Sequence, residues 1–232
     1  MKIDIRECLK LLDEKNPRYQ GHTNAIISMV GEDIAATAFK HYSRSITELR
    51  ERRFYAVGFP PGSGPRLDRW FYNKHKKLLY QCEIKSWCAW AITAWELKHD
   101  ASRRETLEIS NKYWGGPIMN EFKGQKKYGK TSKILMKMKK PDGFLSSTKL
   151  EALLILWFPI SSNKNLKPFF SVKTRDLRIK WENQTTFKRL HFFSVSLYLR
   201  SLLEKGEKYL KINAEDMSDT KQRLTMLEKI II

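Results

Sequence analysis

Residues 66–85 of this 232-residue chain read RLDRWFYNKHKKLLYQCEIK, and this stretch decides the expected fold. Two short runs rich in aromatic and aliphatic residues, 66–72 and 78–85, flank a polar turn at 73–77. This pattern predicts two adjacent strands of a meander. Side chains alternate between the two faces of a strand, so the second run should present one apolar and one polar face. The apolar face would carry Tyr80, Cys82 and Ile84, and the polar face Gln81, Glu83 and Lys85.

In the rest of the chain, the spacing of hydrophobic residues switches between the period of helices and that of strands. We expect a short helix plus loop up to residue 21, helices over 24–45, 87–98, 102–113, 192–203 and 219–229, and strands over 54–59, 134–139, 150–160 and 169–172. Trp114-Gly115-Gly116-Pro117 should end the helix before it. This order predicts an α/β or α+β core in a single domain.

The charge balance narrows the class of partner. Lys and Arg number 44 against 25 Asp and Glu, which gives a net charge of +19. Such a charge favours a polyanion, either nucleic acid or anionic lipid. An AT-rich genome, which enriches lysine, is the alternative explanation. Three cysteines are too few for a disulfide framework. No run of about 18 apolar residues and no signal-peptide pattern occurs, so we expect a cytoplasmic protein that does not bind a membrane.

The polar residues of the hairpin suggest metal-assisted chemistry. Asp68 should meet Glu83 across the hairpin, and two carboxylates this close repel each other unless a cation lies between them. Carboxylates can hold Mg²⁺ against a phosphodiester, and Lys85 can position water or stabilise developing charge. The pattern acid-x-Lys occurs five times in the chain. Only at Glu83 does it lie on an expected strand beside an acid on the neighbouring strand. The alternative is a surface strand with an ordinary cross-strand ion pair.

Asp68, a gap of fourteen residues and then Glu83-Ile84-Lys85 resembles the PD-(D/E)xK nuclease superfamily. Restriction endonucleases, Holliday junction resolvases and lambda-type exonucleases belong to it. The resemblance covers roughly residues 29–98, with Leu67 where the family usually has proline. It implies a restriction-endonuclease-like α/β core, with a central mixed sheet flanked by helices, over about 24–160. The helical pattern of the C-terminal residues separately predicts a helical part over about 187–232.

The resemblance also implies roles for individual residues. Asp68 would be the main metal ligand and Glu83 the second, and Ile84 would offer its backbone carbonyl. Lys85 would orient or activate the attacking water. Glu32, on the preceding helix, would be an outer or second-metal ligand, although an acid near a helix N-terminus is also favoured by the helix dipole alone. The implied cofactor is Mg²⁺, for which Mn²⁺ would substitute.

Eight residues are candidates for contacts with nucleic acid. They are Arg66, Arg69, Trp70, Gln81, Ser86, Lys126, Lys127 and Lys130. Several have simpler alternatives: Gln81 as a solvated strand residue, Ser86 as the N-cap of the helix that follows, and the three lysines as part of a solvated basic face.

The function expected from these observations is that of a Mg²⁺-dependent deoxyribonuclease, an endonuclease active in restriction, phage defence or repair. DNA is the expected partner, with RNA as an alternative, and a homodimer would suit a double-strand cutter. The competing hypothesis is a non-catalytic nucleic-acid-binding or defence accessory protein, in which the charge is the function and the Asp68 pair is structural.

Overall fold

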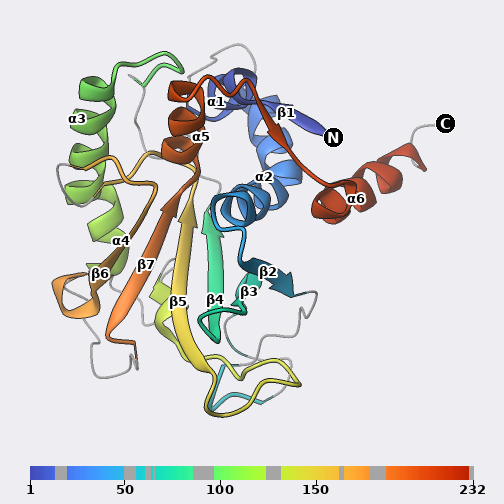
Figure 1. Ribbon diagram of the computed structural model, residues 1–232, viewed down its shortest axis with the longest axis vertical. Helices are drawn as coiled ribbons and strands as arrows, with labels where there is room; N and C mark the ends of the chain where they lie inside the picture. Colours follow the sequence, from blue (N-terminus) through green and yellow to red (C-terminus); the bar gives the residue numbers. More distant parts are fainter. Residues whose placement is uncertain are drawn as a thin grey trace.

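The computed structural model describes residues 1–13, 20–49, 56–60, 64, 66–85, 97–123, 132–161, 165–177 and 187–229. Within these residues the chain is an α/β protein whose main sheet has six strands in the order β2-β3-β4-β5-β7-β6 (Figure 1). The strands are β2 (Ile46–Leu49), β3 (Arg69–Asn73), β4 (Leu78–Lys85), β5 (Lys149–Leu156), β6 (Phe169–Lys173) and β7 (Arg189–Ser194).

The sheet is mixed. Strands β2, β3 and β4 form an antiparallel meander, and β5 pairs parallel with both β4 and β7. Strand β6 adds an antiparallel edge to β7. The expected α/β class with a central mixed sheet flanked by helices is therefore confirmed. The β3–β4 hairpin follows the sequence prediction closely, because 74–77 forms the turn between the two strands.

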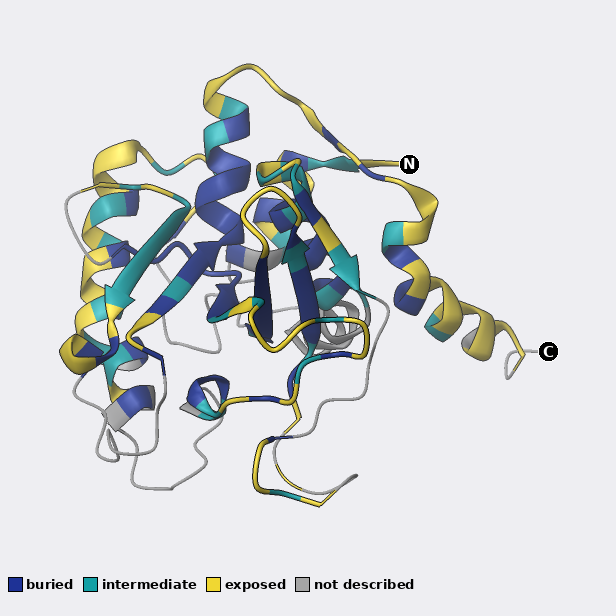
Figure 2. Ribbon diagram, turned by 60° about the horizontal axis from the view of Figure 1, so that its bottom comes forward, coloured by how far each residue is buried: buried dark blue, intermediate teal, exposed yellow. Residues whose placement is uncertain are grey.

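Helices pack on both faces of the sheet, and each face forms a hydrophobic core with the helices that cover it. The first core is built with α1 (Ile5–Asp13), α2 (Gln20–Tyr42) and α5 (Val195–Glu204). The second is built with α3 (Arg103–Tyr113), the π-turn η2 (Trp114–Ile118), α4 (Met119–Lys123) and the 3-10 turn η3 (Ser132–Leu135). The centre of the sheet is consequently buried (Figure 2).

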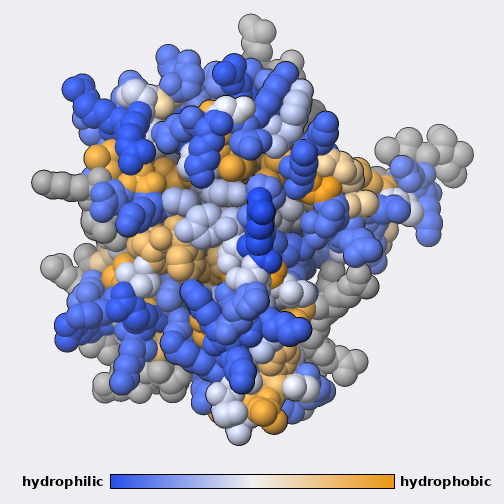
Figure 3. Space-filling model, viewed as in Figure 1, coloured by the Kyte–Doolittle hydropathy of each residue, from blue (hydrophilic) through white to orange (hydrophobic). Residues whose placement is uncertain are grey.

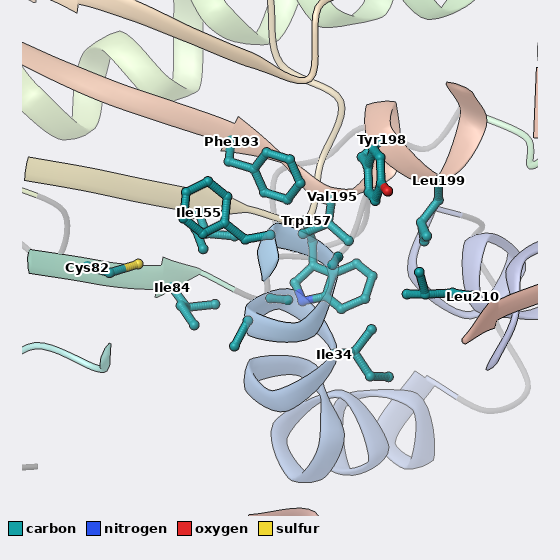
Figure 4. Close-up of a cluster of buried hydrophobic side chains, with 14 of the residues drawn as sticks. Ile34, Cys82, Ile84, Ile155, Trp157, Phe193, Val195, Tyr198, Leu199 and Leu210 are labelled. Atoms are coloured by element: carbon teal, nitrogen blue, oxygen red, sulfur yellow. The ribbon is translucent and has the colours of Figure 1, made fainter. Parts of the chain in front are cut away.

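Strand β4 shows why the alternation matters. Tyr80, Cys82 and Ile84 enter the first core, as the sequence predicts, and lie near Trp157 and Phe193. Figure 4 shows Cys82 and Ile84 on the side of the sheet that faces α2 and the Trp157 indole. Burial of each large apolar side chain contributes roughly 1.5–3 kcal/mol. The opposite face of β4 is covered too, because Leu79 enters the second core.

Two expected strands are absent from the described residues. Of the strand expected over 54–59, residues 54 and 55 lie outside the described residues. In the rest, Ala56 forms only an isolated bridge with Met138, and a turn follows at Gly58, whose φ of 88° favours glycine. The first strand of the meander is instead β2, further upstream. Residues 134–139 form part of η3 and that single bridge, because their backbone groups bond the Gln81 side chain rather than a neighbouring strand.

Other helix boundaries also differ from expectation. The helix at 102–113 is confirmed as α3, with a capping box between Ser102 and Glu105. The chain does not stop at 114–117 but continues through η2 into α4. A π-turn can absorb Pro117, which has no N–H to donate. The expected helix at 87–98 lies mostly outside the described residues.

The C-terminal part differs from the predicted helical region over about 187–232, because it also contains two strands. β7 occupies 189–194 inside the main sheet, and α5 begins only after Ser194, whose side chain accepts a hydrogen bond from the Leu197 amide. β8 (Tyr209–Lys211) pairs with β1 (Lys2–Asp4) in a second, two-stranded sheet. Three further elements complete the described chain: η4 (Thr174–Leu177), η6 (Ala214–Met217) and α6 (Ser218–Glu228). None of the described helices is long and apolar enough to span a membrane.

Candidate active site

The β3–β4 pairing brings Asp68 beside Glu83. The amide of Asp68 donates to the carbonyl of Cys82 (3.0 Å), which extends the ladder one residue beyond β3. In return, Oδ2 of Asp68 accepts a hydrogen bond from the amide of Ile84 (2.7 Å). The Asp68 carboxylate is thereby held against the backbone between Glu83 and Lys85. A short acidic side chain at a strand end can make this contact only because the hairpin register places it there.

Glu83 is the most unusual carboxylate of this cluster, because only 1% of the residue is exposed. Its Oε1 accepts from the Lys85 ammonium and from the Nζ of Lys133, which lies 2.9 Å away. Its Oε2 is buried and has no hydrogen-bond partner among the described residues. The pKa of Glu83 is raised to about 7. Burial is the largest cause, the negative charge of Asp68 adds to the rise, and the two lysines oppose it.

Lys133 was not anticipated from the sequence. It lies on η3, nearly fifty residues after Lys85, and reaches both Glu83 and the carbonyl of Arg66 (2.7 Å). Its neighbours Ile134 and Leu135 are fully buried in the second core. No local motif surrounds Lys133 in the sequence. Lys133 is held at the site because the Gln81 side chain forms hydrogen bonds with the 134–138 backbone. The pattern of residues along the sequence does not reveal this long-range contact.

Glu32 approaches the cluster from α2. Burial raises its pKa, and the next largest cause is the negative charge of Asp68, which places the two carboxylates within electrostatic reach. Helix α2 is fastened at this point by the Trp157 indole, whose Nε1 donates to the carbonyl of Gly31 (3.1 Å). The side chain of Glu32 remains 37% exposed and lies 3.9 Å from a guanidinium nitrogen of Arg223 on α6.

Asp68 also lines a cleft of about 660 Å³ between α2, β2 and the chain around η6. Among the described residues that line it, five are carboxylates: Asp33, Glu48, Asp68, Glu215 and Asp216. Two are cations, Lys40 and Arg69. The cleft is therefore acidic in a chain of net charge +19, whose visible face in Figure 3 is mostly hydrophilic. Such a surrounding suits a cation better than a bare phosphate.

Three predicted nucleic-acid contacts are corrected by burial. Gln81 is fully buried, and its Nε2 donates to the carbonyls of Ile134 (2.6 Å) and Met136 (2.7 Å). Trp70 is fully buried in the second core. Arg69 is only 7% exposed. A strand covered on both faces leaves none of these side chains open to a macromolecule.

Arg69 instead joins three elements. Its Nη2 lies 2.9 Å from carboxylate oxygens of Asp33 on α2 and Asp219 on α6, and its Nε lies 3.3 Å from Glu48 on β2. Arg66 is exposed and remains a candidate contact. Ser86, Lys126, Lys127 and Lys130 lie outside the described residues.

The donor set can be compared with what a metal requires. Among the described residues, no group of three or more His, Cys, Asp and Glu side chains is arranged to hold a metal ion. Mg²⁺, however, is commonly held by one or two carboxylates, with water and substrate oxygens completing its shell. Asp68 and Glu83 supply such a pair. The unpartnered Oε2 of Glu83 and the raised pKa of its carboxyl are both features that a nearby cation would relieve. The residues therefore fit a hard divalent cation.

Comparison with protein-family models, with curated proteins and with solved structures found no match to this chain. The class that the fold defines is thus an α/β protein with a six-stranded mixed sheet in the described residues.

Proposed function

We propose that this chain is a Mg²⁺-dependent nuclease of the PD-(D/E)xK kind that hydrolyses phosphodiester bonds of DNA. One observation carries the proposal. The Asp68 carboxylate is bonded to the backbone between Glu83 and Lys85, next to a Glu83 oxygen that is buried and unpartnered among the described residues. A merely structural ion pair would not be expected to leave a buried carboxylate oxygen without a partner.

The order of elements supports the same proposal. Helix α2 carries Glu32 and precedes the β2-β3-β4 meander, whose last strand carries Glu83 and Lys85. The next strand of the sheet, β5, runs parallel to β4 and so requires a crossover connection. A helix followed by a meander whose last strand carries E-x-K is the order that the resemblance implies for a restriction-endonuclease-like core. The helix that it implies after Lys85 lies mostly outside the described residues.

Each residue of the site has its own role in the proposed phosphodiester hydrolysis. Asp68 and Glu83, with the carbonyl of Ile84, would hold Mg²⁺, which when bound neutralises phosphate charge and lowers the pKa of coordinated water. The Ile84 amide keeps the Asp68 carboxylate in one orientation. Lys85, held against Glu83, positions the attacking water or stabilises the charge that develops on the phosphate. Glu32, whose side chain is 37% exposed, would be an outer ligand.

The substrate class follows from charge. The net charge of +19 favours a polyanion, and backbone phosphate contacts position nucleic acid without reading its sequence. We place DNA first and treat RNA as an outcome of the test. Restriction, phage defence and repair are the settings in which such an activity is used.

The test compares wild type with Lys85→Ala and with Lys137→Ala, a control that removes an exposed lysine. Each protein is incubated with plasmid, linear and single-stranded DNA and with RNA, in Mg²⁺, Mn²⁺ or EDTA. We expect cleavage by wild type and by the control, abolished by EDTA and by Lys85→Ala. Equal residual cleavage by wild type and Lys85→Ala would indicate a contaminant. Salt-sensitive binding without any cleavage would contradict the proposal and favour the non-catalytic binding protein.

A further inference from the structure

Lys133 is positioned by a rigid part of the fold. The three hydrogen bonds between the Gln81 amide group and the 134–138 backbone tie the segment after Lys133 to the middle of β4. Ile134 and Leu135, next in sequence, are fully buried. The backbone of Lys133 is thus fixed next to the strand that carries Glu83 and Lys85, while its side chain remains 23% exposed.

The contacts of its ammonium leave room for a ligand. A lysine ammonium has three donors. Among the described residues, the acceptors of Lys133 are the Oε1 of Glu83 (2.9 Å) and the carbonyl of Arg66 (2.7 Å). One of the three donors therefore has no acceptor among the described residues, and the partly exposed side chain can offer it to an anion.

The net charge of the site indicates a role for Lys133. Once Glu83 is ionised, the carboxylates of Asp68 and Glu83 are balanced by the ammonium groups of Lys85 and Lys133 before any metal binds. A divalent cation on the two carboxylates would then leave a positive excess, which opposes metal binding and attracts an anion. With Lys85 as the only lysine, the excess of positive charge after metal binding would be smaller. The charge of Lys133 therefore lowers the affinity of the two carboxylates for a metal ion, and it stabilises the site once a phosphate group binds.

We infer that Lys133 is a second phosphate-contacting lysine of this site, recruited by the fold from outside the Asp68–Lys85 motif. This inference rests on the proposed function and names the group of the substrate that Lys133 touches, the phosphodiester. Its signature is a pair of opposite effects: removing the charge of Lys133 improves binding of the metal alone and impairs turnover of the nucleic acid.

The test uses the full chain with Lys133→Met, Lys133→Gln and the control Lys137→Met, which removes one exposed positive charge from the same segment. Binding of Mg²⁺ and Mn²⁺ is measured by calorimetry without nucleic acid, at a pH well above the pKa of Glu83 so that a proton on this carboxyl does not compete with the metal. Cleavage of DNA is measured under single-turnover conditions. We expect both Lys133 variants to bind the metal as tightly as wild type or more tightly. We expect their cleavage rates to fall at least about tenfold, as for the loss of one charge-stabilising contact. Lys137→Met should leave both quantities within about twofold of wild type.

Lys133→Gln guards against a purely structural effect, because its amide keeps a donor for the Arg66 carbonyl while the charge is lost. Metal binding weakened together with cleavage, in both variants, would overturn the inference and make Lys133 a structural residue. Cleavage equal to that of the Lys137→Met control would overturn it as well. An inactive wild type would overturn the proposed function itself, and that outcome is distinct because it appears before any variant is compared.

Discussion

The carboxylate of Asp68 accepts a hydrogen bond from the backbone amide of Ile84 at 2.7 Å. This contact crosses from the segment before β3 to the end of β4 and fixes the charge of Asp68 beside Glu83. Hydrogen bonds to an ionised acceptor are among the stronger ones in proteins. Asp68 is therefore presented by the backbone of the strand that carries its partner carboxylate.

Replacing Asp68 with asparagine should separate charge from shape. The amide oxygen of Asp68→Asn can still accept from Ile84, so the variant should unfold within about 1 kcal/mol of wild type. Its affinity for Mg²⁺ should fall at least tenfold, because one of the two ligand charges is lost. Calorimetric titration and urea unfolding measure the two quantities. Unchanged metal affinity would remove Asp68 from the proposed metal site.

The raised pKa of Glu83 predicts a pH dependence of stability. In the folded state this carboxyl has a pKa of about 7, against 4.5 for the free group. Between those values the folded protein binds the proton that the unfolded chain releases, so stability from this group is complete below about pH 4.5 and is lost as pH rises through 7. The loss is at most about 3–4 kcal/mol, at 1.36 kcal/mol per pKa unit.

Urea unfolding from pH 4.5 to 8 measures this dependence against Glu83→Gln, which does not titrate. The stability of wild type relative to the variant should decline as pH rises. A difference that stays constant across this range would show that Glu83 is ionised throughout.

Addition of a divalent metal ion should raise the unfolding free energy, whereas a rise in pH lowers it. A divalent cation that binds only the folded chain stabilises it, by about 2.7 kcal/mol at a free concentration one hundred times the dissociation constant. We expect Mg²⁺ to raise the unfolding free energy of wild type, with a larger effect above pH 7 where Glu83 is ionised. EDTA should reverse the gain. Asp68→Asn and Glu83→Gln serve as controls, and an equal gain in either would place the metal elsewhere.

Arg69 should prove to be a structural residue. In Arg69→Met, Asp33 and Asp219 lose the guanidinium that lies 2.9 Å from each. Removing one partner of a buried ion pair typically costs about 3–5 kcal/mol. Because Asp219 lies in α6, the C-terminal helix should also become sensitive to protease. Unfolding and limited proteolysis check both effects, and Arg66→Met, at an exposed position, is the matched control. A stability loss of the same size in both variants would contradict the role assigned to Arg69.

Local structure was largely readable from the sequence. The hairpin of residues 66–85, the buried strand β5 and the capped helix α3 all follow from short-range signals: alternation, an apolar run, and Ser102 three residues before Glu105. The juxtaposition of Asp68 with Glu83 and Lys85 could also be anticipated, because the side chains of one hairpin are related by register alone.

Tertiary structure decided the rest. Periodicity reports which residues share a face but not what covers that face, so only the fold shows that the polar face of β4 is buried and that Gln81 bonds a distant backbone. The same packing brings Lys133 to Glu83. It also places residues 189–194 in the sheet, where an apolar run alone cannot distinguish a strand from the start of a helix. The sequence by itself determined the pair of carboxylates and its lysine, and long-range packing determined how deeply they are buried and which second lysine joins them.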